Sequence, residues 1–426
     1  MPPARAVRIA RIGADGDGIA ADQDGAPFYV PFTLPGETVQ AVPCARRGEG
    51  FAATAEAILD ASPDRTVPPC PHFGICGGCA LQHWRDASYA DWKTGLLDAA
   101  LRRAGFTDIA LNPLVRTAPG GRRRVDLALR RVQGSVHVGL HRARGSDIVD
   151  LTACPVLDPT LAALIAPLRV LLVGLALLKR EGSAIVNLLE SGPDLLLRTD
   201  APPSLVDRNR LTDFARAHAL PRITWALGAS EPETICALRP AVTTLSGVSL
   251  APPPGAFLQA SAAAEAAIVA AVVDGLPRKR TAKTRIAELY AGCGTISFAL
   301  APHIRVAAWE GDGPAVNALR QAANQAGLAG RIEAGQRDLT RQPVSAKELA
   351  AFAAVVLDPP HTGALEQTGQ IAASGIKRVI YVSCNPAALA RDAKLLHDAG
   401  YRLLAATPVD QFLWSARLES VCVFGR

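Results

Sequence analysis

Hydrophobic and polar positions from residue 285 to the end of the chain alternate as strands and helices do. Seven short apolar runs rich in β-branched residues predict strands, at residues 285–290, 305–309, 331–334, 353–357, 378–382, 401–408 and 418–424. Helices are expected between them, near residues 295–301, 314–326, 364–374 and 386–399. This order predicts a doubly wound α/β domain that binds ligands at the carboxyl ends of its strands.

The first 60 residues follow a different pattern, because short β-type runs are separated by turns rich in Gly and Asp. Their spacing predicts a small β-barrel, with residues 13–18 forming a turn. Residues 155–250 mix expected helices (161–179 and 208–217) with expected strands (184–189 and 195–199), and four residues at 252–255 read Pro-Pro-Pro-Gly. We therefore expect three domains: a barrel at 1–60, a central α+β domain at 61–250 and the α/β domain at 251–426.

Composition and charge add a polyanionic partner to this picture. The 426 residues carry a net charge of +6, and eight arginines but one acid, Asp126, lie between Arg116 and Arg144. Arginines on one face of a sheet suit a phosphate backbone, so the central domain is expected to bind RNA, the alternative being a solvated charged face. The longest apolar tract, residues 161–178, is broken by Pro167 and Arg169, and the start lacks the apolar core of a signal peptide, so we expect a cytoplasmic protein without a membrane span.

The nine cysteines are unevenly clustered, and their odd number argues against a disulfide framework. Cys70, Cys76 and Cys79 have the spacing C-x5-C-x2-C with glycines between the last two, which is typical of a metal centre. Cys154 is the natural fourth ligand. Four thiolates can hold zinc or an iron–sulfur cube, and spacing alone favours zinc because zinc sites are commoner. His72 and His83 are further ligand candidates.

A different cysteine, Cys384, ends the expected strand at 378–382 and precedes Asn385-Pro386, a favourable start for a helix. The amino end of a helix stabilises a thiolate, which is the reactive form of cysteine. Cys384 is therefore a candidate nucleophile, and the alternative is a small buried core cysteine.

Glycines and acids follow the other strands of the same domain. Gly292 and Gly294 come directly after the first strand and let the backbone approach a ligand closely. Glu310 ends the second strand, where a carboxylate can accept hydrogen bonds from both hydroxyls of a ribose. Asp338 follows the third strand and is a candidate to contact the edge of an adenine ring. Asp358-Pro-Pro ends the fourth strand. These positions predict one ligand site at this edge of the sheet.

Taken together, these motifs resemble those of the RNA 5-methyluridine methyltransferases, the 23S rRNA and tRNA uracil-C5 enzymes, which are class I S-adenosylmethionine-dependent methyltransferases. The resemblance covers nearly the whole chain, and its amino-terminal stretch is similar to that family's RNA-binding TRAM barrel. It is carried by the cysteine motif with Cys154, Phe257-Leu-Gln259, Leu289-Tyr-Ala-Gly-Cys-Gly294, Asp358-Pro-Pro360, Ser383-Cys-Asn-Pro386 and Leu418-Glu419.

The resemblance implies a role for each motif. Cys384 would be the nucleophile and Glu419 the general base, and the four cysteines would hold a 4Fe-4S cluster, in place of the zinc that spacing favours. The positions that match the binding site for S-adenosylmethionine are Gln259, Tyr290, Thr295, Glu310 and Asp358. The expected activity is methylation of carbon 5 of a uridine, in 23S rRNA first and in tRNA as the alternative, by a chain that we expect to be monomeric.

Three positions depart from the family pattern. His361 follows Asp358-Pro-Pro where Arg is usual, Arg417 precedes Glu419 by two residues where His is usual, and Ser261 replaces a common Asn. These departures motivate a further alternative, an RNA-binding protein or chaperone with weakened catalysis.

Overall fold

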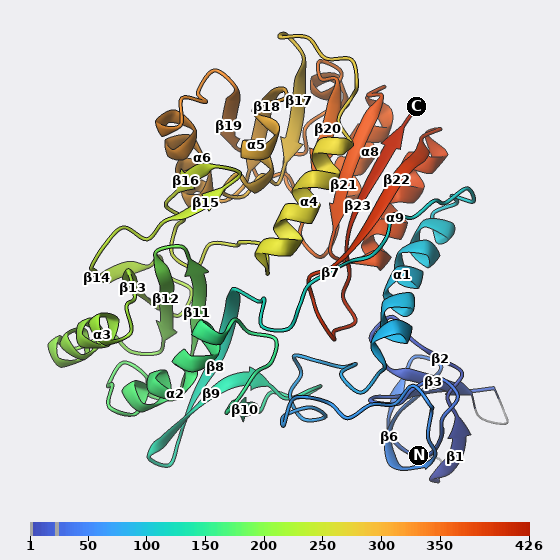
Figure 1. Ribbon diagram of the computed structural model, residues 1–426, viewed down its shortest axis with the longest axis vertical. Coiled ribbons are helices and arrows are strands. Elements are labelled where there is room, and N and C mark those ends of the chain that lie inside the picture. Colours follow the sequence, from blue (N-terminus) through green and yellow to red (C-terminus); the bar gives the residue numbers. More distant parts are fainter. Residues whose placement is uncertain (1–2, 22–24) are drawn as a thin grey trace.

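The computed structural model describes residues 3–21 and 25–426, within which the strands form three large sheets that follow one another along the chain. In Figure 1 the amino-terminal and central sheets lie beside each other at the lower end of the molecule, and the carboxy-terminal sheet lies above them. A hairpin of β15 (Thr243–Leu245) and β16 (Val248–Leu250) follows the central sheet and packs into the core of the last one.

The amino-terminal sheet closes into a barrel because its two edges are one continuous segment. Its strand order is β1-β5-β6-β4-β3-β2, and β1 pairs with β5 while β2, two residues later, pairs with β3. The N–H groups of Ile9 and Ala10, between β1 and β2, bond to Glu37 and Ile19 on opposite sides. The predicted barrel and its turn at residues 13–18 are confirmed. Its strands are β1 (Arg5–Arg8), β2 (Arg11–Ile12), β3 (Gly18–Ala21), β4 (Pro27–Val30), β5 (Thr38–Arg47) and β6 (Gly50–Asp60).

The central sheet has seven strands in the order β10-β9-β8-β11-β12-β13-β14, and helices α2 (Pro159–Val173) and α3 (Leu205–Ala217) pack on it through a common apolar core. Its most basic part is the hairpin of β8 and β9, which turns at Gln133 and Gly134, both with positive φ. The strands are β8 (Arg124–Val132), β9 (Ser135–His141), β10 (Ile148–Asp150), β11 (Glu181–Leu189), β12 (Gly192–Thr199), β13 (Arg222–Leu227) and β14 (Glu233–Ala237).

The carboxy-terminal sheet is doubly wound, with the order β19-β18-β17-β20-β21-β23-β22-β7. Strands β17 to β21 are parallel, and β23 runs antiparallel to β21 and β22. Its strands are β17 (Arg285–Leu289), β18 (Arg305–Glu310), β19 (Ile332–Gln336), β20 (Ala354–Leu357), β21 (Arg378–Ser383), β22 (Arg402–Asp410) and β23 (Glu419–Gly425), with β7 described below.

Separate apolar cores cover the two faces of this sheet. One face packs against α4 (Ala262–Asp274), α5 (Thr295–Leu300) and α6 (Gly313–Gln325). The opposite face packs against α7 (Ala346–Leu349), α8 (Leu365–Ala373), α9 (Pro386–Asp398) and α1 (Asp86–Arg103). Because both faces are buried, the inner strands β17, β20, β21 and β23 are mostly apolar, as the hydrophobic runs predicted.

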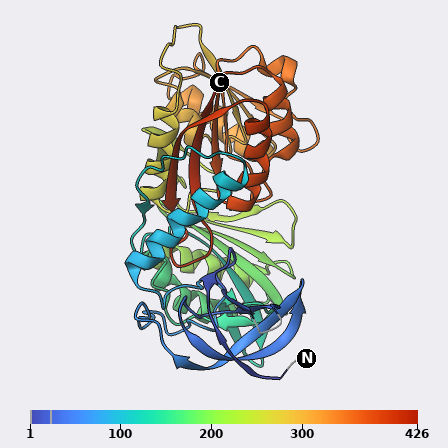
Figure 2. The same cartoon turned by 90° about the vertical axis from the view of Figure 1, so that its right-hand side faces the viewer.

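An early segment of the chain completes this last sheet. Helix α1 packs beside α9, and β7 (Val115–Arg116) pairs in parallel with Val409–Asp410 at the end of β22. Figure 2 shows α1 crossing from the carboxy-terminal sheet toward the barrel. The link is polar as well as apolar, because the fully buried Lys93 lies 2.8 Å from Asp410, which also accepts a hydrogen bond of 2.8 Å from Tyr89. The sequence did not predict this connection.

The expected helix at 161–179 ends early, since the chain leaves the helix at Gly174 and re-enters the central sheet at β11. In the part of the chain that the structure describes, no helix combines the length and apolar character needed to cross a membrane.

Candidate active site

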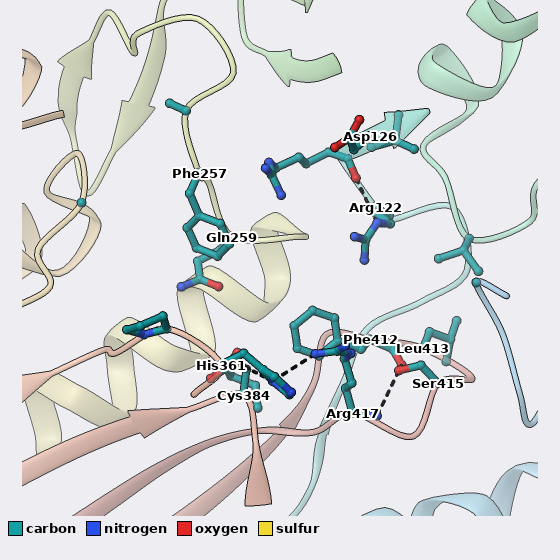
Figure 3. Close-up of a pocket in the computed structure, with 18 of the residues that line it drawn as sticks. Arg122, Asp126, Phe257, Gln259, His361, Cys384, Phe412, Leu413, Ser415 and Arg417 are labelled. Atoms are coloured by element: carbon teal, nitrogen blue, oxygen red, sulfur yellow. Dashed lines mark hydrogen bonds between the residues drawn. The ribbon is translucent and has the colours of Figure 1, made fainter. Parts of the chain in front are cut away.

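A cavity of about 970 Å³ lies between the carboxyl ends of the last sheet's strands and strand β8 of the central sheet. Figure 3 shows Cys384, His361 and Arg417 on one wall, Phe257 and Gln259 descending from above, and Arg122 and Asp126 opposite. The cavity brings together the candidates for the nucleophile and the general base, the side chains expected to bind the cofactor, and the four cysteines: Cys70, Cys76, Cys79, Cys154, Gln259, Tyr290, Thr295, Glu310, Asp338, Asp358, Cys384 and Glu419.

Cys384 lies between the end of β21 and the start of α9, as predicted. Asn385 caps the helix by accepting a hydrogen bond of 3.0 Å from the N–H of Ala387, and Pro386 is its first residue. The expected stabilisation of a thiolate is wrong for the unliganded protein, however. Burial, followed by the nearby carboxyls of Glu419 and Asp358, raises the pKa of the Cys384 thiol to about 12, and the opposing effect of Arg417 is smaller. Cys384 is therefore a protonated thiol at neutral pH.

Two buried carboxyls face this thiol. Burial and then the neighbouring Asp358 raise the pKa of Glu419, and burial also raises the pKa of Asp358. Oε2 of Glu419 accepts a hydrogen bond of 2.5 Å from Gln411, whereas its buried Oε1 has no partner among the described residues. Glu419 therefore has one free oxygen at the cavity wall that can exchange a proton with a bound molecule.

Gln411 connects these groups into one network. Its Nε2 also donates to Oε1 of Gln259 (3.0 Å), and Nε2 of Gln259 donates to Asp358 (3.3 Å). The Oε1 atom of Gln411 accepts a hydrogen bond of 3.0 Å from the N–H of Ala260. Sequence reasoning missed Gln411, whose one signal is its position directly after β22. The network fixes the orientations of Glu419 and Asp358 relative to Cys384.

The loop after β17 has the backbone that a closely bound ligand needs. Gly292 and Gly294 have φ values of 55° and 98°, which L side chains rarely adopt. A Cβ at position 294 would come within 2.9 Å of the Phe298 ring, whereas the space beside Gly292 is open. Glu310 fixes this loop by accepting hydrogen bonds of 2.9 Å from the N–H groups of Gly292 and Asp312.

The remaining cofactor candidates surround this loop. Tyr290 precedes it with φ of 63°, and Thr295 opens α5. Asp338 lies exposed after β19, where its carboxylate accepts backbone hydrogen bonds from Thr340 and Arg341. Glu288, which the sequence analysis did not single out, is also at the cavity wall, and burial raises its pKa to about 8.

The four cysteines converge at the other end of the cavity from two loops, one after β6 and one after β10. They are close enough for Cys154 and Cys70 to contribute to the raised pKa of the Cys76 thiol, after burial as the main cause. Yet the described part of the chain contains no group of three or more His, Cys, Asp or Glu side chains arranged to hold a single metal ion. A tetrahedral zinc would need sulfurs about 2.3 Å from the metal, and hence about 4 Å from one another.

The four cysteines are thus not arranged around a single zinc ion. The chain approaches closely here, because a Cβ at Gly77 would lie 3.0 Å from the carbonyl oxygen of His141. The N–H of Gly78 points at Cys76 Sγ at 3.4 Å. His83 is not available as a ligand, because it is fully buried near the rings of Phe32 and Phe73.

The basic region divides into paired and unpaired arginines. Arg116, Arg123 and Arg144 form ion pairs with Asp86, Glu265 and Asp17, so they hold the fold together. Arg122 and Arg124 instead line the cavity, where burial lowers the pKa of both guanidinium groups. Arg124 stacks on the exposed ring of Phe257 at 5.4 Å.

The three departures from the family pattern have separate explanations. Ser261 caps α4, because its buried hydroxyl accepts a hydrogen bond of 3.1 Å from the N–H of Ala264. His361 and Arg417 contact each other, with 3.0 Å between His361 Nδ1 and Arg417 Nη1 (Figure 3). An imidazole and a guanidinium are thus both present beside Cys384, at positions exchanged relative to the family pattern.

Comparison with known proteins gives a consistent result. The model of the tRNA (uracil-5-)-methyltransferase family matches residues 252–426. An RNA methyltransferase of Caulobacter vibrioides, described as uncharacterized, is 41% identical over 98% of this chain and 99% of its own length. The 23S rRNA (uracil(1939)-C(5))-methyltransferase of Chromohalobacter salexigens is 34% identical, over 98% of this chain and 88% of its own.

Among solved structures, the Pyrococcus abyssi tRNA (uracil-54, C5)-methyltransferase in complex with S-adenosyl-L-homocysteine has the same fold. Its TM-score is 0.73 at 20% identity, over 99% of this chain and 100% of that one. The extent and identity of the matches over the full length, together with the cavity just described, lead to one conclusion: this chain belongs to the RNA uracil-C5-methyltransferase family.

Proposed function

We propose that this protein methylates carbon 5 of one uridine in 23S rRNA through a covalent bond between Cys384 and the base. The observation that carries this proposal is the meeting of Cys384, Glu419, Asp358 and Gln259 in one cavity, from four separate parts of the chain. The choice of 23S rRNA rests on the full-length similarity to the Chromohalobacter enzyme.

S-adenosylmethionine would supply an electrophilic methyl group and a positive sulfonium charge. The open space beside Gly292 and the fixed carboxylate of Glu310 suit the amino acid and ribose ends of such a molecule. Asp338 and Tyr290 at the same rim suit the adenine. Asp358 and Gln259 would hold the end of the donor nearest to the uracil.

The residues around the base would act in sequence. Carbon 5 of uracil is a weak nucleophile, and addition of the Cys384 sulfur to carbon 6 converts the ring to an enolate whose carbon 5 can take the methyl group. Glu419 Oε1 would then remove the proton from carbon 5, and expulsion of the sulfur restores the aromatic ring. A uridine reaches this cavity only when it leaves its stack.

The RNA around the target would be held by the basic wall. Among the described residues, Arg122 and Arg124 have no carboxylate partner at hydrogen-bond distance and suit phosphates, and the exposed ring of Phe257 suits stacking on a base. We also propose the three units 1–60, 61–250 and 251–426, with the first two gripping RNA.

Cys70, Cys76, Cys79 and Cys154 would hold a 4Fe-4S cluster that organises the RNA-facing end of the cavity. Their all-cysteine donor set at one end of the cavity supports it. Anaerobically purified protein should contain about four iron and four sulfide per chain. Stoichiometric zinc in their place would overturn this assignment.

The function is tested with labelled S-adenosylmethionine, anaerobic protein and unmodified transcripts of 23S rRNA and tRNA. Label at one uridine of the 23S transcript supports the proposal. Label in tRNA would favour the second candidate, which the family model's description and the Pyrococcus structure motivate. Full activity of Cys384→Ser would overturn the covalent mechanism, and RNA binding without transfer to either transcript would favour an RNA-binding protein.

A further inference from the structure

The cavity leaves one step of this mechanism without a residue to perform it. Attack on carbon 6 needs a thiolate, but Cys384 is a protonated thiol in the unliganded protein. The helix amino end next to it does not overcome burial and the two carboxyls. Some group must therefore take the thiol proton as the sulfur attacks.

We propose that His361 Nδ1 is the general base that takes this proton, and that Arg417 occupies Nδ1 until RNA is bound. The proposal rests on the methyltransferase function argued above. Both residues, His361 and Arg417, differ from those usual in the family.

Geometry supports this assignment first. His361 Nδ1 lies 3.9 Å from Cys384 Sγ, within hydrogen-bond reach of a sulfur atom. The other ionisable groups facing the thiol are Asp358 on the same loop, Glu419 on β23 and Arg417 before β23. Among the described residues, neither Asp358 nor Glu419 forms a hydrogen bond with the sulfur, and Arg417 cannot accept a proton. His361 is the remaining candidate in contact with the sulfur.

The hydrogen bonds of His361 define its tautomer. Arginine only donates, so the contact of 3.0 Å from Arg417 requires an unprotonated Nδ1. The proton is then on Nε2. Asn385 Nδ2 is also a donor and lies 3.5 Å from Nε2, but it is closer to the carbonyl oxygen of His361 (2.9 Å), to which it donates. The shorter contact with Arg417 therefore determines the tautomer. The lone pair of His361 therefore points to the region that Arg417 and Cys384 share.

Charge explains the part played by Arg417. Burial and the adjacent Arg417 lower the pKa of His361, so the imidazole is neutral at neutral pH but a poor base. Arg417 is exposed at the mouth of the cavity, where the phosphates of a bound RNA can draw it away. Its departure frees the lone pair of Nδ1 and removes the charge that weakens it. The base is thus strengthened when substrate is present.

Protons and electrons balance in this scheme. The S–H bond of Cys384 breaks and its proton moves to Nδ1, while the sulfur electron pair forms the S–C6 bond and the C5=C6 pair moves to the O4 enolate. After methyl transfer, Glu419 takes the C5 proton and the C5=C6 bond reforms. The S–C6 pair returns to sulfur, which takes back the proton from Nδ1. One proton leaves through Glu419 per methyl group.

The first test uses the protein without RNA, so that it does not depend on the substrate. The rate of Cys384 alkylation by neutral iodoacetamide, followed on the Cys384 peptide by mass spectrometry from pH 6 to 10, reports how readily the thiol loses its proton. Arg417→Ala should increase this rate several-fold near pH 7.5, and adding His361→Gln to it should cancel the increase. A decrease in Arg417→Ala would show that Arg417 stabilises the thiolate directly, and would overturn the proposal.

The second test uses RNA containing 5-fluorouridine, from which no C5 proton can be removed, so that the adduct persists. His361→Ala should slow single-turnover adduct formation roughly 10²- to 10⁴-fold, and added imidazole should restore part of the rate. His303→Ala, an exposed histidine outside the cavity, is the matched control.

The outcomes separate the two proposals. An absence of adduct with the wild-type protein would contradict the proposed function itself. A normal adduct in the wild type, with an equal rate and pH profile in His361→Ala, would contradict only the role of His361. Because His361 is exposed, its replacement should leave the melting temperature unchanged.

Discussion

Burial gives Cys384, Asp358 and Glu419 a common property, because it favours the uncharged form of each side chain. A carboxylate works as a base only when ionised, so Glu419 requires either higher pH or a positive charge nearby. The network through Gln411 favours the ionised form, because a hydrogen bond donated to a carboxylate stabilises its charge.

Glu419→Gln should separate bond formation from proton removal. The amide keeps the shape and the contact with Gln411 but cannot accept the C5 proton, so the methylated adduct should accumulate. Turnover should fall roughly 10²- to 10⁴-fold while covalent RNA remains visible on denaturing gels. Rapid turnover in this variant would assign the base to another residue.

Gln411→Leu should shift the pH dependence of kcat/KM toward alkaline pH. The variant removes the hydrogen bond that lowers the pKa of Glu419, so the raised pKa rises further. Below that pKa Glu419 is protonated and inactive as a base, and activity should therefore recover only at higher pH. Gln325→Ala, at the exposed end of α6, should leave the profile unchanged, whereas an acid shift in Gln411→Leu would contradict the network.

These residues also mark how far sequence reasoning extends. The positions of Cys384 and its capping residues were predictable because strand, cap and helix start are contiguous. The role of Gln411 and the contact between His361 and Arg417 could not be predicted. His361 and Arg417 are 56 residues apart in the sequence, so their contact depends on tertiary packing. The lowered thiol pKa was predicted wrongly, since a local helix end was weighed without the buried carboxyls.

At the scale of elements, α1 holds the loop that carries Arg417. Lys93 bonds to Asp410 and to the main-chain carbonyls of Phe412 and Arg417, and Tyr89 accepts from the N–H of Trp414 (2.8 Å). The helix therefore fixes both ends of the loop between β22 and β23. Through that loop it positions Arg417 and the start of the strand that carries Glu419.

Lys93→Met should destabilise the fold by about 3–5 kcal/mol, because it leaves Asp410 buried without its cation. Thermal or urea unfolding measures this loss. Lys93→Met combined with Asp410→Leu should recover much of it. Lys394→Met removes an exposed surface pair with Asp398 and should cost far less stability, and an equal loss in both single variants would contradict the anchoring role.

Most elements were predicted from the pattern, but their assembly was not. The strands of the last sheet were predictable from continuous apolar runs. The pairing of β7 with this sheet could not be predicted, because a strand of two residues shows no hydrophobic periodicity. The boundary at residue 250 remains a prediction, and residues 86–116 pack with the last sheet although they precede the central one.

At the scale of the molecule, the central domain and the last sheet place basic and reactive groups around one opening. The unpaired Arg122 and Arg124 come from the central sheet, whereas the nucleophile comes from the last sheet. RNA that enters must therefore contact both. A monomer is sufficient for this arrangement and stays a prediction.

Arg124→Ala should weaken RNA binding and make it less dependent on salt. Each cation that neutralises a phosphate contributes about 0.7 to 0.9 to the slope of log K against log salt. Titrations at several salt concentrations should show the slope falling by about that amount. Arg305→Ala lies at the opposite ends of the strands and should not change it, and an unchanged slope in Arg124→Ala would remove this residue from the RNA path.

The long-range bond between α1 and β22 also has a consequence for synthesis. Lys93 and Asp410 are 317 residues apart, so the ribosome completes α1 long before the strands that cover it exist. Until then, the apolar face of α1, with Leu97 and Leu101, has no permanent partner. Contacts between such distant residues slow folding and expose apolar surface to aggregation. The nascent chain therefore carries this apolar face uncovered until the strands of the last sheet have been made, and α1 can hold the loop of Arg417 in place only after that.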